Sequence, residues 1–402
     1  GELTKERTVY ATEHYLDQQG FWIFTSGDML KLLIHQGFVH SFKTISIEEY
    51  KDMVNFRTQT MLSLWGKDAQ LRNIMKDNIS RRTFLKAGIA VGTGLYGLSY
   101  LSSFERPRPL KTFKENSLKK NLVVVHGDVH EGNDEGSVIK EMMGRGIKAI
   151  GGMEKLISKG DNVVIKPNIA WDRYPEYAAN TNPFVVAALA GLCIEAGANR
   201  VKVLDHTCAE NPGPSYINSG IEKAAKKVGA EVRFVNKRLF KDIKIPGGKV
   251  LDSWPFYEEL IYRDEADVLI NVPIAKQHST SRLSMALKNT MGMIGGNRGS
   301  IHKDIHPKIA DLNRVVKVDL AVLDAFRILK QHGPTGGRLG DVDNTFENAR
   351  RLVLCVDPVV VDSYGATLFG YKGKDIGFIR ESYEAGLGEI DFKLKGVEDI
   401  TI

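Results

Sequence analysis

The chain has 402 residues, of which 26% are charged, and a formal net charge of +6. The positive excess is N-terminal, because residues 1–120 carry 18 Lys and Arg against 12 Asp and Glu, whereas residues 121–402 carry 37 of each kind. A neutral C-terminal region without a basic stripe argues against nucleic-acid binding, which draws most of its affinity from neutralised phosphates.

Residues 1–74 carry apolar residues at helical spacing, for example at Met29, Leu32 and Leu33. This periodicity predicts a small helical N-terminal segment. It contains no motif that indicates a function.

Residues 75–104 resemble a bacterial twin-arginine export signal. The motif S-R-R-T-F-L-K at Ser80–Lys86 is followed by an uncharged, mildly apolar run from Ala87 to Phe104, which is the order of a signal peptide. The 74 residues before Met75 and the lack of a clear A-x-A cleavage site favour the alternative, an internal amphipathic or buried helix. We favour the signal, which predicts recognition by the twin-arginine export machinery and a periplasmic or cell-envelope location. Residues 105–120, with Pro107 and Pro109, are typical of an exposed linker.

From Asn121 onward, short apolar runs alternate with helical stretches, which indicates βαβ units and a buried parallel sheet. The prediction is therefore an α/β domain over residues 121–392, with a mostly parallel, doubly wound sheet and flanking helices, and a C-terminal tail over 393–402. The expected strands are 122–125, 162–165, 200–204, 231–235, 268–272, 320–323 and 352–356, and the expected helices are 138–157, 183–196, 217–228, 283–293, 307–316 and 358–369.

Polar side chains follow four of the seven predicted strands. Ligands of open parallel sheets bind beyond the carboxyl ends of the strands, where loops and helix N-termini converge. We therefore expect one small-molecule or metal site there. Its residues would include Lys166 and Asn168, Asp205 and His206, Lys276 and His278, and Asp324.

The segment from Lys276 to His306 is the densest in such groups. It continues with Lys288-Asn289, a glycine-rich loop that includes Gly292, Gly295 and Gly296, and then His302 and His306. Glycine amides could cradle a phosphate or carboxylate, although the loop does not match the P-loop pattern. The i, i+4 spacing of His302 and His306 would suit a metal on a helix. Pro307 disfavours such a helix, so capping or anion-contacting histidines are the alternative.

Lys166 and Lys276 differ from ordinary surface lysines because each lies at the end of an apolar run. A lysine there must face a polar cavity or have a charge partner, since burial alone is costly. We expect Lys166, Lys276 and Lys288 to hold an anion, with Asn168 and Asn289 orienting it. His278 would be the general acid/base, because histidine titrates near neutral pH.

The cysteines, Cys193, Cys208 and Cys355, are far apart and form no C-x-x-C pair. No iron–sulfur cluster or Cys-rich zinc site is therefore expected. Cys193 and Cys355 lie in apolar runs typical of a core, whereas Cys208 lies in a polar loop and is the one cysteine with a candidate role.

Together these motifs resemble the family known as domain of unknown function 362. The resemblance covers about 270 residues and implies an α/β domain that is often exported or linked to redox proteins, without an established reaction. Some members carry ferredoxin-type cysteine clusters, which this sequence lacks. The matching blocks are V-V-I-K-P-N-I at 163–169, T-N-P at 181–183, E-A-G-A at 195–198, L-I-N-V-P-I-A-K-Q-H at 269–278, A-L-K-N-T-M-G at 286–292 and D-P-V-V-V-D at 357–362.

Three functions remain open from the sequence. The first is an enzyme that acts on a small anionic substrate. The second is a non-catalytic metal- or cofactor-binding maturation protein of the cell envelope, with a divalent metal as its cofactor and a redox protein as its partner. The third is a structural envelope protein, which the strand-end cluster of polar residues disfavours.

Overall fold

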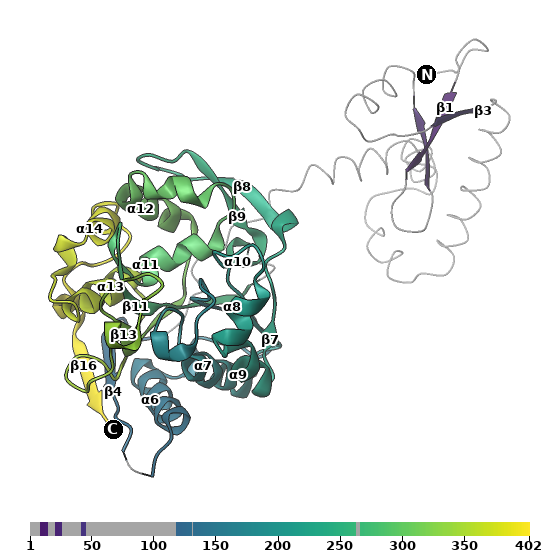
Figure 1. The fold of residues 1–402 in the computed structure, drawn as a ribbon. Helices are drawn as coiled ribbons and strands as arrows, with labels where there is room; N and C mark the ends of the chain where they lie inside the picture. Colours follow the sequence, from purple (N-terminus) through teal and green to yellow (C-terminus); the bar gives the residue numbers. More distant parts are fainter. Residues whose placement is uncertain (1–8, 15–20, 26–41, 46–117, 131, 263–265) are drawn as a thin grey trace, which may run out of the picture. The chain divides into compact units, whose positions relative to one another are not determined.

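The computed structural model describes residues 9–14, 21–25, 42–45, 118–130, 132–262 and 266–402 (Figure 1). Its contacts divide the chain into two units, Gly1–Arg108 and Pro109–Ile402. The predicted export signal at 75–104 and most of the predicted linker lie outside the described residues. No helix in the described part of the chain is long and apolar enough to cross a membrane.

The described residues of the first unit form a small antiparallel sheet of order β2-β1-β3. Its strands are β1 (Val9–His14), β2 (Phe21–Thr25) and β3 (Phe42–Ile45). The prediction of a helical segment is therefore wrong for these residues. The runs V-Y-A-T and F-W-I-F-T are rich in β-branched and aromatic residues, which favour strands. The positions on which the helical prediction rested lie outside the described residues.

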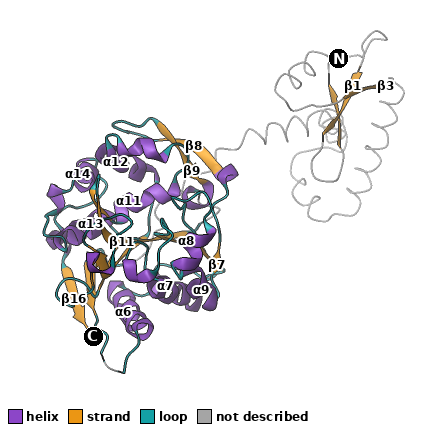
Figure 2. Ribbon diagram, in the orientation of Figure 1, coloured by secondary structure: helices purple, strands orange, loops and turns teal. Residues whose placement is uncertain are grey.

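The second unit is an α/β structure built around an 11-stranded sheet (Figures 1 and 2). Three short strands lie off its main path: β11 (Ile274–His278), β12 (Arg282–Ser284) and β14 (Val342–Asp343). The main path runs β16 (Val397–Thr401), β4 (Leu122–His126), β15 (Arg351–Cys355), β13 (Leu320–Leu329), β10 (Val268–Val272), β5 (Asn162–Pro167), β6 (Arg200–Val203), β7 (Glu231–Val232).

Most pairs along this path are parallel, as predicted. The run β13-β10-β5-β6-β7 is parallel throughout. The exception is β15, which is antiparallel to both of its neighbours, β13 and β4. The sheet is therefore mixed. Its parallel part includes β5, which carries Lys166, whereas Lys276 lies in the off-path strand β11.

Helices cover both faces of the sheet. Figure 1 shows α6 (Glu135–Ile150), α7 (Pro183–Glu195) and α9 (Ile221–Lys227) on one face. The opposite face carries α11 (Ala286–Asn289), α12 (Ile305–Val315), α13 (Pro358–Thr367) and α14 (Gly377–Glu384). The remaining helices are α8 (Gly213–Asn218) and α10 (Glu258–Ile261).

Successive side chains of each strand point to opposite faces of the sheet, so a hydrophobic core lies on each face. The same alternation determines the face on which a polar side chain lies. Val163 and Ile165 of β5 pack in the core with α6 and α7, whereas Val164 packs in the core with α11 to α14. Since successive side chains of a strand point to opposite faces, Lys166 shares the face of Val164. It therefore points toward α11.

Two parts of the predicted domain organisation need correction. The residues assigned to a C-terminal tail include β16, which pairs in parallel with β4 from Val397↔Leu122 to Thr401↔His126, so the sheet extends past residue 392. The sequence reading also missed the hairpin of β8 (Phe240–Lys244) and β9 (Ser253–Tyr257). Strand β8 reads F-K-D-I-K and strand β9 reads S-W-P-F-Y, on either side of a Pro-Gly-Gly sequence. The charged residues of β8 and the Ser and Pro of β9 interrupt the apolar run on which the other strands were recognised.

Candidate functional site

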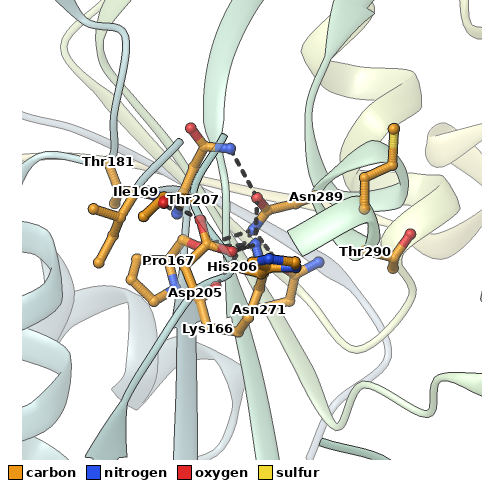
Figure 3. Close-up of polar contacts among 12 residues, drawn as sticks. Lys166, Pro167, Ile169, Thr181, Asp205, His206, Thr207, Asn271, Asn289 and Thr290 are labelled. Atoms are coloured by element: carbon orange, nitrogen blue, oxygen red, sulfur yellow. Dashed lines mark hydrogen bonds and ion pairs between the residues drawn. The ribbon is translucent and has the colours of Figure 1, made fainter. Parts of the chain in front are cut away.

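Lys166 at the end of β5 forms a fully buried ion pair. Its Nζ lies 2.7 Å from Asp205 Oδ1 in the loop after β6, and it donates a 2.8 Å hydrogen bond to Asn289 Oδ1 of α11. Figure 3 shows the three side chains pointing toward one another from different elements. The second oxygen of Asp205 accepts from Ile169 N at 2.6 Å. Residues 36 to 123 positions apart in the chain thus meet near the carboxyl ends of β5 and β6.

Asn168 extends this network to the second strand-end lysine. Its Nδ2 donates to Asn289 Oδ1 at 3.0 Å, and its Oδ1 accepts from Lys276 Nζ at 2.9 Å. Lys276 also donates to the carbonyl oxygen of Ala179 at 2.6 Å. The structure therefore joins Lys166, Asn289, Asn168 and Lys276 in one continuous chain of hydrogen bonds.

The segment that carries Asn168 is held in place by Thr181. Thr181 Oγ1 accepts from Asn168 N at 2.8 Å and donates to Val272 O at 2.7 Å, at the end of β10. A return backbone bond runs from Thr181 N to Asn168 O at 2.9 Å. The T-N-P motif then begins α7, where Asn182 Oδ1 caps Phe184 N. These contacts fix the position of the Asn168 amide relative to β10.

Helix α11 is positioned by two buried side chains. The carboxylate of Asp362 accepts from Ala286 N at 2.7 Å and from Leu287 N at 2.9 Å, which satisfies two free amides at the helix start. Asn271 of β10 donates to Ala286 O at 2.9 Å and accepts from Asn289 Nδ2 at 2.7 Å. Lys288 and Asn289 are therefore held rigidly against the sheet.

Lys288 is a buried cation without a partner. Its side chain is only 8% exposed, and it makes no hydrogen bond or ion pair with any residue that the structure describes. Burial lowers the pKa of Lys288 to about 8, and only its interaction with Cys208 opposes this shift. Lys288 in turn lowers the pKa of Lys276, His278 and His302, so it lies among these three groups.

Lys276 is also an uncompensated cation. It is 2% exposed, and among the described residues no carboxylate lies within 4 Å of its ammonium group, although the carboxylate of Asp205 acts on it from farther away. Burial, followed by the charge of Lys288, lowers the pKa of Lys276 to about 7. A pKa near 7 implies that, at neutral pH, this amine is divided between its charged and neutral forms.

Replacing Lys276 by Met should flatten the pH dependence of folding stability. Between its folded pKa of about 7 and the usual lysine value near 10.4, only the unfolded state binds the proton, so the free energy of unfolding of the wild type rises with pH. Lys276→Met removes about 2–4 kcal/mol of this rise. Urea denaturation of both proteins at pH 6.5 and pH 9.5 measures it. Equal slopes for the two proteins would contradict the shift.

His278 lies near Lys276, Lys288 and His302 but is a poor general acid at neutral pH. Burial and the charges of Lys288, His302 and Lys276 lower its pKa to about 3, so its imidazole is neutral. Its Nδ1 accepts from Thr280 N at 3.1 Å, which leaves the proton on Nε2. Burial and the neighbouring cations, which the local sequence does not show, both oppose the protonation that we expected near pH 7.

His302 and His306 do not form a pair. His302 ends a short 3₁₀ helix (Arg298–His302), and its ring stacks on that of His278 with centroids 5.8 Å apart. His306 lies in α12, and its ring stacks on Phe378 of α14. No group of three or more His, Cys, Asp or Glu side chains in the described residues is arranged to hold a metal ion. The i, i+4 spacing was misleading because the chain turns at Asp304 between the two elements.

The glycine-rich loop contacts the network through Gly292 rather than through Gly295 and Gly296. A Cβ at Gly292 would lie 1.9 Å from Asp205 Oδ1 and 2.5 Å from Lys166 Nζ, so only glycine fits against the ion pair. Gly295 N donates to Pro255 O at 2.8 Å, and Gly296 lies against Pro255 of the β8-β9 hairpin. In the structure, Gly295 and Gly296 pack on this hairpin.

Asp324 belongs to a separate polar network. Its carboxylate accepts from Asn182 N at 2.7 Å and from Phe326 N at 3.0 Å, and burial raises its pKa to about 6. Asn182 then donates to Glu135, which pairs with Arg327. Asp324 thus helps to hold the start of α7. In the described structure it makes no hydrogen bond or ion pair with Lys166, Lys276 or Lys288.

His206 lies beside the cluster and supports the loop after β6. Its Nδ1 contacts Ile294 O at 2.8 Å, and its ring packs on Phe240. Burial and the charge of Arg298 lower its pKa. Arg298 itself donates to the backbone carbonyls of His206, at 2.7 Å, and Thr207. Both residues therefore fix the shape of the loop that carries Asp205.

Four residues important to this geometry were missed by sequence reasoning: Asn271, Thr181, Arg298 and Asp362. One signal was available, because Asn271 interrupts the apolar run V-L-I-N-V, and a polar residue inside a buried strand needs a partner. The side chains of Arg298 and Asp362 act on backbone groups distant in the sequence, which no local pattern reveals.

Comparison with known proteins finds a curated protein with a similar sequence and a solved structure with limited similarity. A thylakoid-associated protein of Synechocystis is 26% identical over 205 residues, which cover 48% of this chain and 60% of that protein. The chain thus matches less than two thirds of the length of this relative. A crystal structure of a protein from Thermotoga maritima is similar with a TM-score of 0.33 and 12% identity, over 67% of this chain and 60% of the other.

The sequence blocks that carry the family resemblance lie in the segment that matches a described family. Residues 163–367, about half of the 402-residue chain, match its model, and this range contains Lys166, Lys276 and Lys288. The chain belongs to the family described as Domain of unknown function (DUF362).

Proposed function

We propose that the protein is an exported enzyme that acts on a small anionic substrate bound at the lysine cluster, which we define as Lys166, Lys276 and Lys288. The observation that carries this proposal is the burial of Lys276 and Lys288 without a carboxylate partner among the described residues. A buried charge without a counterion is costly, so such groups are retained where a ligand supplies the opposite charge.

The charge balance of the cluster favours a substrate with a phosphate or carboxylate group. Asp205 neutralises Lys166 at 2.7 Å, which leaves Lys276 and Lys288 as the cations available to a ligand. Ammonium groups donate up to three hydrogen bonds each and bind oxyanions well. Asn168, whose side chain is partly exposed, borders the cluster and is placed to orient the ligand.

The two available lysines suit different tasks. With a pKa of about 8, Lys288 is mostly charged at pH 7 and would hold the anion. With a pKa of about 7, Lys276 would transfer a proton at neutral pH, because catalysts of proton transfer work best when their pKa lies near the working pH. The neutral His278 would donate a hydrogen bond through Nε2. The proposed reaction class is therefore proton transfer on an anion-bearing substrate.

Two observations support the proposed location at the cell envelope. The twin-arginine-like motif at Ser80–Lys86 and the association of the Synechocystis relative with thylakoids both favour a protein handled by an export machinery and associated with the cell envelope. The alternative function, a metal- or cofactor-binding maturation protein, would use His278, His302 and His306, together with Asp205, His206 or Asp324. The first three histidines are divided between two places in the fold.

Sulfate binding at different pH values tests the proposal. Sulfate keeps its charge of −2 from pH 6 to 9, so only the protonation of the protein changes. Deprotonation of Lys276 and Lys288 removes the positive charge as the pH rises, and we expect the affinity to fall by at least about tenfold between pH 6.5 and pH 9. Isothermal titration calorimetry on the full chain measures this. No detectable sulfate binding at pH 6.5 would refute the proposal.

A further inference from the structure

The loop after β6 places an exposed thiol beside the lysine cluster. Cys208 is exposed, and its backbone N–H donates to Ala170 O at 3.0 Å. Ala170 is two residues from Asn168, which binds Lys276. On the other side, Arg298 holds the carbonyl groups of His206 and Thr207, just before the cysteine. Cys208 is therefore anchored at the border between solvent and the buried lysines.

The ammonium group of Lys288 interacts electrostatically with this thiol. More than nine-tenths of its side chain is buried, and among the described residues its ammonium makes no hydrogen bond or ion pair. Cys208 interacts electrostatically with Lys288, and also with Lys166 and Lys276. Cationic groups attract anionic molecules to their neighbourhood. An anion that enters the cluster would meet this sulfur beside the groups that bind its charge.

The other two cysteines are not exposed. Cys193 and Cys355 are buried in the cores, and burial raises the pKa of both thiols. They serve as internal references for an unreactive thiol in the same chain.

We propose that Cys208 is a nucleophile for small anionic electrophiles, meaning molecules that carry a carboxylate or phosphate next to an electrophilic carbon. This inference rests on the proposed anion binding at the lysine cluster. In the reaction, the thiol proton passes to the neutral amine of Lys276, and the sulfur forms a bond to the electrophilic carbon. The bond from that carbon to its leaving group breaks, and the leaving group departs with the electron pair. No oxidant or reductant is needed.

Iodoacetate and iodoacetamide test the inference, since they react with thiols in the same way and differ in charge. The full chain is treated with each reagent at pH 7.5, and labelling of each cysteine is followed by mass spectrometry. Because cations raise the local concentration of an anion, we expect Cys208 to react with iodoacetate about tenfold faster than with iodoacetamide. Cys193 and Cys355 should stay unlabelled. Sulfate should slow the iodoacetate reaction and leave the iodoacetamide reaction unchanged.

Variants assign the effect to the cluster. Lys288→Met should remove the preference for iodoacetate, Lys288→Arg should retain it, and Lys223→Met, at an exposed position of α9, should not change it. The inference is overturned if wild-type Cys208 shows no preference for iodoacetate or if sulfate fails to protect it, and both measurements need only the wild type. Sulfate binding by calorimetry without this preference would overturn the inference and leave the proposed function intact.

Discussion

Lys166→Met should destabilise the protein by about 3–5 kcal/mol, the largest loss that we expect from a single substitution here, because it leaves Asp205 as a buried carboxylate without its cation. The hydrogen bond from Lys166 to Asn289 is lost as well. Urea denaturation at pH 7 measures the free energy of unfolding. The matched control, Lys223→Met, removes an exposed lysine of α9 and should change stability by less than about 0.5 kcal/mol.

A double-mutant cycle separates the ion pair from the general effect of a cavity. Asp205→Asn keeps an oxygen that can accept from Ile169 N but removes the charge that faces Lys166. The double variant Lys166→Met/Asp205→Asn should lose clearly less stability than the sum of the two single variants, with a coupling energy of about 1–3 kcal/mol. Additive losses would show that the two charges do not depend on each other.

Lys288→Met should weaken sulfate binding about 30- to 100-fold at pH 6.5, because it removes a charge-assisted hydrogen bond of about 2–3 kcal/mol. The folded protein should not lose stability, since the buried ammonium has no partner among the described residues and its removal relieves a desolvation cost. Calorimetry measures the affinity, and urea denaturation measures the stability of the same samples.

Two variants distinguish a specific role of Lys288 from a general effect of charge. Lys288→Arg keeps the positive charge and should bind sulfate more tightly than Lys288→Met. Lys223→Met removes the same charge from an exposed position and should bind as the wild type does. Equal weakening in Lys223→Met and Lys288→Met would contradict a local site. A large loss of stability in Lys288→Met would show that the lysine has a structural role instead.

The sequence by itself predicted the elements whose signals are local. The apolar runs of β4, β5, β6, β10 and β15 were recognised because a strand buried on both faces needs apolar side chains at almost every position. Helix starts such as Asn182-Pro183 and Asp357-Pro358 were recognised because capping depends on neighbouring residues. The mostly parallel α/β fold and the gathering of polar groups at strand ends follow from these patterns.

Only the tertiary structure decided which of these groups act on one another. Lys166 and Lys276 look alike in the sequence, yet Asp205 neutralises one and no described carboxylate pairs with the other. The imidazole of His278 is neutral because it is buried and because Lys288, His302 and Lys276 lie near it. Strand β16 joins the sheet by pairing in parallel with β4. Charge pairing and desolvation depend on distance in space, and Lys166 and Asn289, which are neighbours there, lie 123 positions apart along the chain.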